Sequence, residues 1–535
     1  MTTTTTTASE DHQLEMNKTP WQAIEDMIYK IHPIRSREES QEESRAQLKL
    51  LIDLAQSPAQ KLKILMILIN GILIWDHESI WDHVPLKDWK TCVEYLFLML
   101  DILYKYPNIK VSPKLDVTYH HHKGADYQGP IYLHGDLHEI VFEGFSFRFF
   151  DSLKHINPCE PEYDERLQEE PTLILVCRNV MEYLEQIKDF RAAAKVAFQL
   201  LRLLHYKSHQ DYEDQVTKKL QLSQYTETGT SDSLDHKSVD GQHTDSPPFV
   251  IPKVVPRRPS YPINSTTLFD KALNFFFEYG SPGKGRKPFA MLSNVYHLAI
   301  IDKFPDSCRA MTKFFDEVQD VNSINLVYFN RALAQLGLCA FRAGCIAEAH
   351  TYLSWLYGCG RVDKLLGQTV SYIPYEDRGP TLPGQCIFTP YHMHINLDLL
   401  DAVHLVCAMF PEDPNVAAST HVSKGKVISQ KIRTFFNSSE SETSRGPPEH
   451  VCDLVVDATR DLRKGYFQKA FMVIESLKLP MLLSKRGDVL EMLKTKIKEE
   501  ALRSQNYQLT SICDLPSLYQ LTPKCELSEI DSPVV

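Results

Sequence analysis

The apolar residues of this chain recur at intervals of three and four positions, and this spacing limits the fold more than any other feature. In residues 48–55, apolar side chains lie at positions i, i+3, i+4 and i+7, which share one face of a helix. Similar stripes occupy residues 190–204, 326–340, 346–356 and 451–462. Strand-like alternation is scarce, since the β-branched residues 250–255 are interrupted by Pro252. The chain is therefore predicted to be all-α.

Three corners between these stripes share one local pattern. Each corner is counted from one residue, here called the corner residue. Two positions after it an apolar residue starts the next stripe, and three positions further on there is an alanine. The three sets are Lys188, Phe190 and Ala193; Gly344, Ile346 and Ala349; and Gly465, Phe467 and Ala470. Glycine closes a helix in the left-handed conformation, whereas lysine adopts it only at a cost, so the first corner is expected to close differently. Single corners of this kind arise by chance, but three favour a solenoid of TPR- or HEAT-like helix pairs.

Polar and proline-rich segments divide the stripes into blocks. Residues 222–248 are rich in Ser, Thr and Asp, and we expect them to be disordered because they have few apolar side chains to bury. Residues 107–130 are expected to form a shorter break. The expected blocks are a partly disordered tail at 1–44, a first helical block at 45–221, the linker at 222–248, a helical-repeat block at 249–370, a loop at 371–390, a helical module at 391–503 and a divergent tail at 504–535.

Composition and charge narrow the classes of function. The longest apolar run, residues 64–75, is shorter than the roughly 20 residues that a membrane-spanning helix needs. The N-terminus has no secretory pattern, and the 12 cysteines are scattered without paired spacing, so we expect a cytoplasmic protein with reduced thiols. A formal net charge of −11 argues against a surface that grips RNA as a whole. Any RNA contact is expected to be local.

The candidate chemical motifs lack the partners that chemistry would need. His120–His122 have no further ligands at a metal-site spacing, and His392, His394 and His404 are expected to be cap or core residues. The glycines around Lys284 resemble a phosphate loop, but neither Ser nor Thr follows the lysine. We expect no catalytic residue, no cofactor and no metal, and the chain is predicted not to be an enzyme.

Basic clusters are the remaining functional candidates. Two of them lie around Arg257 and Arg286, and the third flanks apolar positions in a plausible amphipathic helix, where its cations could line up along phosphates. This third cluster is the candidate RNA or ribosome contact, and it consists of Lys424, Lys426, Lys431 and Arg433. The alternative is that these cations only solvate the outer face of a packed helix.

Several runs, taken in order, resemble the C subunit of eukaryotic translation initiation factor 3. They include AQLGLCAFR at residues 334–342, YHMHINL at 391–397, LLDAVHLVCAM at 399–409, GPPE at 446–449 and IKEEALR at 497–503. Weaker likeness extends upstream, through SPAQKL at 57–62 and DFRAAAK at 189–195. Chance similarity over the whole ordered set is implausible, and the resemblance spans most of the chain.

The resemblance implies a non-enzymatic scaffold in a helical assembly that ends in a PCI module and sits on the small ribosomal subunit. Its implied partners are the other subunits of the factor, other initiation factors, and the small ribosomal subunit with its RNA, without a membrane. We expect no counterpart of the family's long acidic N-terminal arm in residues 1–34, and we expect most of the winged helix that follows the family's last helices to be missing. We therefore expect a partial PCI module and weakened assembly. Alternatives are a scaffold subunit of the proteasome lid or signalosome, and a helical-repeat RNA-binding protein.

Overall fold

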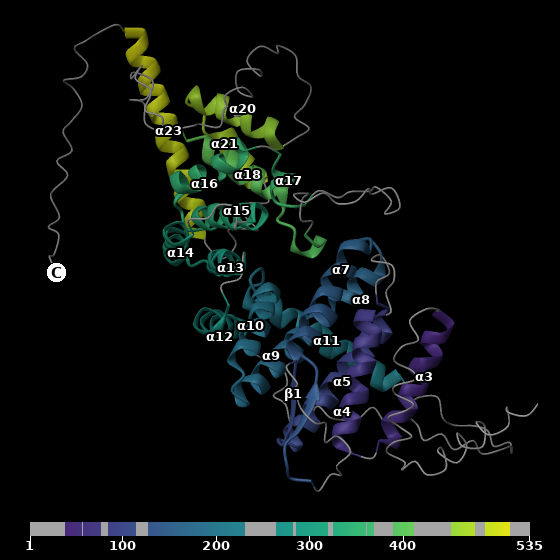
Figure 1. Cartoon of the computed structure of the whole chain (residues 1–535). Coiled ribbons are helices and arrows are strands. Elements are labelled where there is room, and N and C mark those ends of the chain that lie inside the picture. The colour runs from purple at the N-terminus through teal and green to yellow at the C-terminus, as the bar shows by residue number, and fades with distance from the viewer. Residues whose placement is uncertain are drawn as a thin grey trace, which may run out of the picture. The chain divides into compact units, whose positions relative to one another are not determined.

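The computed structural model describes residues 38–55, 57–75, 84–113, 127–229, 264–281, 285–318, 325–359, 361–368, 389–410, 451–476 and 487–513. These residues are overwhelmingly helical, as Figure 1 shows, and the prediction of an all-α solenoid is confirmed. They fall into two compact units. The N-terminal unit takes in residues up to Ile301, with Ala310–Tyr328 and Gly367–His394, and the C-terminal unit takes in Asp302–Arg309, Phe329–Leu366 and the residues from Ile395 onward.

The N-terminal unit is a run of helices with a shared apolar core. Trp89 of this core is fully buried, and its ring makes an edge-to-face contact with Phe145 at 5.8 Å between centroids. α9 and α10 pack together, and α12 packs against α10. The elements are α3 (Glu38–Leu54), α4 (Pro58–Asn70), the π-helix η1 (Gly71–Trp75), α5 (Leu86–Lys105), α6 (Leu137–Glu139), the π-helix η2 (Ile140–Phe147), α7 (Arg148–His155), α8 (Pro161–Leu167), α9 (Glu170–Gln186), α10 (Phe190–Leu204), α11 (His209–Gly229), α12 (Ser265–Tyr279), α13 (Arg286–Ile300) and the 3-10 turn η6 (Tyr391–Met393).

A two-stranded parallel sheet interrupts the helices of this unit. β1 (Ile109–Ser112) pairs with β2 (Ile131–His134), in register from Ile109 opposite Ile131. The Asn108 side chain donates hydrogen bonds to the carbonyls of Tyr127 and Gly129, at 2.9 and 3.0 Å. β1 lies within the expected break at residues 107–130, and that expectation was wrong for these four residues. Ladder bonds over four pairs compensate for their short apolar pattern.

Some block boundaries also differ from the expected ones. α11 continues to Gly229, so the first eight residues of the expected linker are helical, and the rest of it lies outside the described residues. α3 begins at Glu38, inside the expected N-terminal tail, and α23 (Gly487–Cys513) continues past residue 504. The reason is cooperativity, because each residue added to an existing helix gains a hydrogen bond even where its side chain is polar.

The C-terminal unit continues the succession of packed helices. α16 (Ile346–Gly358) packs against α18 (Leu397–Ala408), α18 packs against α20 (Val451–Arg463), and α20 contacts both α21 (Gln468–Ser476) and α23. The short α17 (Val362–Leu365) follows α16. The division between the units passes through α14 (Phe304–Glu317) and α15 (Leu326–Arg342). Within the described residues, no helix is both long and apolar enough to cross a bilayer.

The three predicted corners have one backbone geometry. Lys188, Gly344 and Gly465 have φ values of 64°, 80° and 87°. At each corner this residue donates its N–H to the carbonyl three positions back, and the next residue donates to the carbonyl five positions back, at 2.9–3.0 Å. These are the two bonds of a Schellman motif. The corner alanines, Ala193, Ala349 and Ala470, are fully buried, and each corner joins two consecutive helices, which confirms the prediction.

The expectation that the Lys188 corner closes differently was wrong. Two backbone hydrogen bonds fix the left-handed conformation there, and the Asp189 side chain caps α10 by accepting from the Ala192 N–H at 3.1 Å. These contacts outweigh the steric cost of a Cβ in that conformation, which is roughly 1–2 kcal/mol. The first corner therefore carries strain that the two glycine corners lack.

Replacing Lys188 with glycine should raise the free energy of unfolding by about 1 kcal/mol, because glycine adopts positive φ without the Cβ clash. Urea denaturation measures the change. Lys188→Ala is the matched control, since it removes the exposed side chain and keeps the Cβ, and its stability should stay close to that of the wild type. Equal stability of the glycine and alanine variants would contradict the strain.

Candidate functional site: a buried polar network in the N-terminal unit

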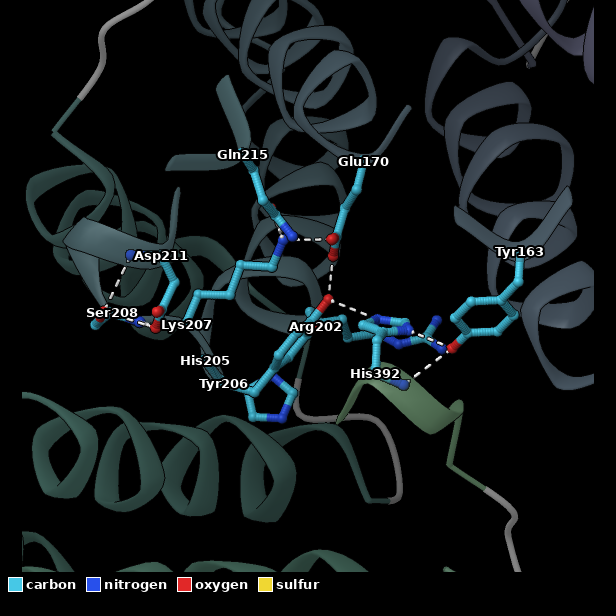
Figure 2. Close-up of polar contacts among 10 residues, drawn as sticks. All are labelled: Tyr163, Glu170, Arg202, His205, Tyr206, Lys207, Ser208, Asp211, Gln215 and His392. Carbon is cyan, nitrogen blue, oxygen red and sulfur yellow. Dashed lines mark hydrogen bonds and ion pairs between the residues drawn. The ribbon is translucent and has the colours of Figure 1, made fainter. Parts of the chain in front are cut away.

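The N-terminal unit contains a chain of polar side chains that connects three helices to the short segment around η6. Figure 2 shows these side chains pointing toward one another. We call this set the buried network, and it consists of Tyr163, Glu170, Tyr206, Lys207, Gln215 and His392.

Local sequence signals position each part of the network. Glu170 and Pro171 start α9, where a carboxylate is favoured by the helix dipole and proline costs no hydrogen bond. α10 ends at Leu204, and the turn that follows carries Tyr206 and Lys207. Ser208 and Asp211 then cap each other: the Ser208 N–H donates to Asp211 Oδ2 at 3.1 Å, and the Asp211 N–H donates to Ser208 Oγ at 3.2 Å. This capping box fixes where α11 begins.

The network contains one buried ion pair, which Lys207 forms with Glu170. The Lys207 ammonium donates to Glu170 Oε2 and to the Gln215 side-chain oxygen. The Glu170 side chain is fully buried and that of Lys207 is 4% exposed. Burial lowers the pKa of Lys207, and the Glu170 charge opposes that shift. Such a pair is costly to break because the remaining charge cannot reach water.

His392 completes a continuous line of donors and acceptors. Its backbone N–H donates to Tyr163 Oη at 2.9 Å, and its Nδ1 lies 2.9 Å from the same oxygen. Its Nε2 lies 3.3 Å from Tyr206 Oη, and the Tyr206 hydroxyl donates to Glu170 Oε1. One assignment satisfies every group: Tyr163 donates to Nδ1 of a neutral imidazole, and Nε2–H donates to Tyr206.

Both tyrosines of the network are held in the neutral phenol form. Burial raises the pKa of Tyr163 to about 12, with the His392 N–H opposing the shift and the Glu170 charge adding to it. Burial, and then the charge and hydrogen bond of Glu170, raise the pKa of Tyr206 well above its ordinary value. Phenols that stay protonated act as donors, which is the role that the line of hydrogen bonds requires.

A second ion cluster lies at the residue before Glu170. The Glu169 carboxylate pairs with Lys90 of α5 at 3.2 Å and with Lys219 of α11 at 2.5 Å. Burial raises the pKa of Glu169, but the two lysines, Lys219 foremost, hold it below its ordinary value overall. Adjacent glutamates at the start of α9 thus connect it to α5, α10 and α11.

The network is suited to a structural role. Its charges are paired and its hydroxyls take part in hydrogen bonds, so the chain of bonds fixes the geometry of the elements that it joins. One of those elements is the segment Thr389–His394, which the imidazole of His392 attaches to α8 and to the turn after α10. A second histidine of this segment, His394, donates from Nε2 to the Thr389 carbonyl at 3.0 Å.

The candidate RNA contact, Lys424, Lys426, Lys431 and Arg433, lies outside the described residues, as do His120–His122. His404 is a core histidine, as expected, with 3% of its surface exposed. Among the described residues, no group of three or more His, Cys, Asp or Glu side chains is placed to hold a metal ion. Of the basic cluster around Arg286, Lys287 pairs with Glu317 at 2.8 Å, and the Arg286 guanidinium lies over the Phe198 ring.

Replacing Tyr163 with phenylalanine should speed amide exchange at His392 by at least about fivefold, because the His392 N–H loses its acceptor and one hydrogen bond is worth about 1 kcal/mol or more. Tyr206→Phe is the matched control: it removes a hydroxyl on the other side of the imidazole and leaves that acceptor in place. Hydrogen exchange with mass spectrometry over residues 389–394 measures both. Equal acceleration in the two variants would show that Tyr163 does not protect this amide.

The fold and the network define a class, a helical-repeat protein whose buried polar side chains have a structural role. A family model described as "Eukaryotic translation initiation factor 3 subunit 8 N-terminus" matches residues 2–422. The C subunit of eukaryotic translation initiation factor 3 from Emericella nidulans is 28% identical over 491 residues, which cover 90% of this chain and 54% of that protein. Its counterpart from Coccidioides immitis is 28% identical over 496 residues, or 89% of this chain and 55% of that protein.

The counterpart from Sclerotinia sclerotiorum is 30% identical over 387 residues, which cover 71% of this chain and 42% of that protein. The chain belongs to the family of the translation initiation factor 3 C subunit, which confirms the resemblance seen in its sequence. It spans about half the length of the curated relatives that it matches.

Proposed function

We propose that this chain is a non-enzymatic scaffold subunit of translation initiation factor 3, and that it contributes to assembly of the initiation complex on the small ribosomal subunit. The family match over residues 2–422 carries the proposal. Successive packed helix pairs support it, because solenoids present long faces to partner proteins. The proposed partners are the other subunits of the factor, other initiation factors, and the small ribosomal subunit with its RNA. The proposed location is the cytoplasm.

Residues 391–503 are proposed to form the helical part of a PCI-like module. The packing of α18 on α20, and of α20 on α21 and α23, supports this proposal because it forms a compact helical group with its own buried side chains. The segment Tyr391–His394 belongs with the N-terminal unit, so the module's own helices begin at α18.

Affinity purification tests the scaffold role. A tagged copy of the full chain, isolated from cells under native conditions, should carry with it other subunits of translation initiation factor 3, identified by mass spectrometry. Recovery of proteasome-lid or signalosome subunits in their place would contradict the proposal. RNA recovered without factor subunits would favour an RNA-binding repeat protein.

The proposed ribosome contact is the basic cluster Lys424, Lys426, Lys431 and Arg433. Replacing all four by glutamine should weaken binding to purified small ribosomal subunits and flatten its salt dependence, since each lost phosphate contact lowers the log-log slope by about 0.7–0.9. Sedimentation binding at several salt concentrations measures both quantities. Unchanged affinity and slope would mean that these cations only solvate a surface.

A further inference from the structure

A small cavity of the N-terminal unit has features that the scaffold role does not use. It has a volume of about 280 Å³, is open to solvent on one side, and lies between α10, the first turns of α13 and the start of α15. Its walls are mostly aromatic rings and guanidinium groups, contributed by Phe142, Phe198, Phe289, Tyr328, Arg202 and Arg286.

The aromatic rings form a continuous wall. Phe198 and Phe289 meet with 5.2 Å between centroids at 62°, and Phe289 meets the edge of Tyr328 at 4.6 Å and 81°. Phe289 is buried, whereas Phe198 and Tyr328 are only half-buried and line the cavity. A wall of this kind can take up a flat aromatic ring by stacking or by edge contact.

The two arginines lack an anionic partner within the described part of the chain. Arg202 Nη1 donates to the neutral side-chain oxygen of Gln199 at 3.2 Å, and its guanidinium lies 5.3 Å from the centre of the Phe150 ring. Arg286 lies 5.9 Å from the centre of the Phe198 ring. No described carboxylate forms an ion pair with either, and none lines the cavity. The adjacent Lys287, in contrast, forms an ion pair with Glu317.

This arrangement is electrostatically incomplete. Burial lowers the pKa of Arg202, yet a guanidinium stays charged at neutral pH, so Arg202 is a half-buried cation with no counter-charge among the described residues. An anionic group between Arg202 and Arg286 would supply that charge. Gly285, with φ of 84°, precedes α13, and it lines the cavity together with Arg286, the first residue of that helix.

We propose that this cavity binds one nucleotide unit, with the base against the aromatic wall and the phosphate between Arg202 and Arg286. Bases of single-stranded RNA stack on aromatic rings and on guanidinium planes, and arginine binds phosphate through paired hydrogen bonds. The volume of about 280 Å³ is slightly below the roughly 300 Å³ at which small-molecule sites begin, so the cavity takes no more than a single unit and excludes a duplex. The proposed nucleotide site does not depend on the proposed scaffold role, so an experiment can contradict one proposal and leave the other intact.

Fluorescence anisotropy with the full chain and a labelled octamer of uridine tests the site. Arg286→Gln should weaken binding about tenfold, the effect of losing one charge-assisted hydrogen bond, and should lower the salt slope by about 0.7. Arg202→Gln should weaken binding at least as much. The matched control is Arg191→Gln, on the exposed N-terminal turn of the same helix as Arg202, which should change affinity less than about twofold. Arg286 is exposed, so its variant tests the site even if Arg202→Gln unfolds.

Competition separates the two sources of a nucleotide. Displacement of the octamer by uridine monophosphate would assign the site to free nucleotides as well, whereas resistance to it would assign the site to an RNA strand. Both results support the site, provided that binding depends on the two arginines. Equal binding by Arg286→Gln and Arg191→Gln would overturn it. A second result would also overturn the nucleotide site: the wild-type chain does not bind the octamer but binds a labelled Asp-Phe repeat peptide, and the peptide binding depends on the two arginines.

Discussion

Replacing Glu170 with glutamine should lower the free energy of unfolding of the N-terminal unit by about 3–5 kcal/mol, because it leaves the buried Lys207 ammonium without its counter-charge. The amide keeps the shape of the side chain and can still accept from the Tyr206 hydroxyl, so the change isolates the charge. Urea denaturation, followed by hydrogen exchange in α9 and α10, measures the loss.

The matched control is a surface pair of the same type in the same unit. Lys271 and Glu185 lie 3.0 Å apart with side chains 47% and 24% exposed, so Glu185→Gln should cost no more than about 1 kcal/mol. Adding Lys207→Met to Glu170→Gln should recover much of the lost stability, since the unpaired charge is then removed. Similar losses from Glu170→Gln and Glu185→Gln would mean that the buried pair contributes no more than a surface pair.

Acid should destabilise the C-terminal unit through the buried His404. His404 of α18 is buried between α16 side chains, stacked on Tyr357 at 4.2 Å and near His350 at 5.9 Å, with Ser354 Oγ 3.3 Å from its Nε2. Burial, and then repulsion by His350, lower the pKa of His404 from 6.5 to about 3. The folded unit therefore keeps this imidazole neutral under conditions in which the unfolded chain binds a proton.

The direction of the pH effect follows from that difference. Stability is complete above pH 6.5 and falls as the pH drops toward about 3, by about 1.4 kcal/mol per unit, because only the unfolded chain takes up the proton. From about pH 7 to about pH 5 the loss attributable to His404 should be about 2 kcal/mol. Burial raises the pKa of the nearby Asp401, so protonation of this carboxylate changes stability in the opposite direction.

His404→Phe separates the histidine from other acid-sensitive groups. The ring can still stack on Tyr357 but cannot bind a proton, so the stability of this variant should depend less steeply on pH. Chemical denaturation of both proteins at about pH 7 and about pH 5 makes the comparison. Parallel pH profiles for the wild type and the variant would show that another group controls the acid sensitivity.

Local sequence patterns were enough to establish the helical class, the corners and the family. Apolar spacing of three and four positions depends only on the period of the helix, and the corner alanines are buried because close approach needs a small residue. The Lys188 corner shows the limit of local reasoning: a lysine offered no reason to expect a left-handed cap, and two backbone hydrogen bonds produce one. The helical residues 222–229 show the same limit, because propagation of α11 overrides polar composition.

Which polar residues meet depends on how the helices pack, and no sequence pattern could predict it. Glu170 and Lys207 are 37 positions apart, and Tyr163 and His392 are 229 apart, so no local pattern reports either pair. The start of α9 at a Glu-Glu-Pro run was a readable signal for a helix N-terminus, but it could not name the lysines that pair with it. The aromatic cavity likewise joins residues from η2, α10, α13 and α15. Periodicity is a property of neighbours along the chain, whereas a buried charge is compensated by whatever the packing of distant helices brings next to it.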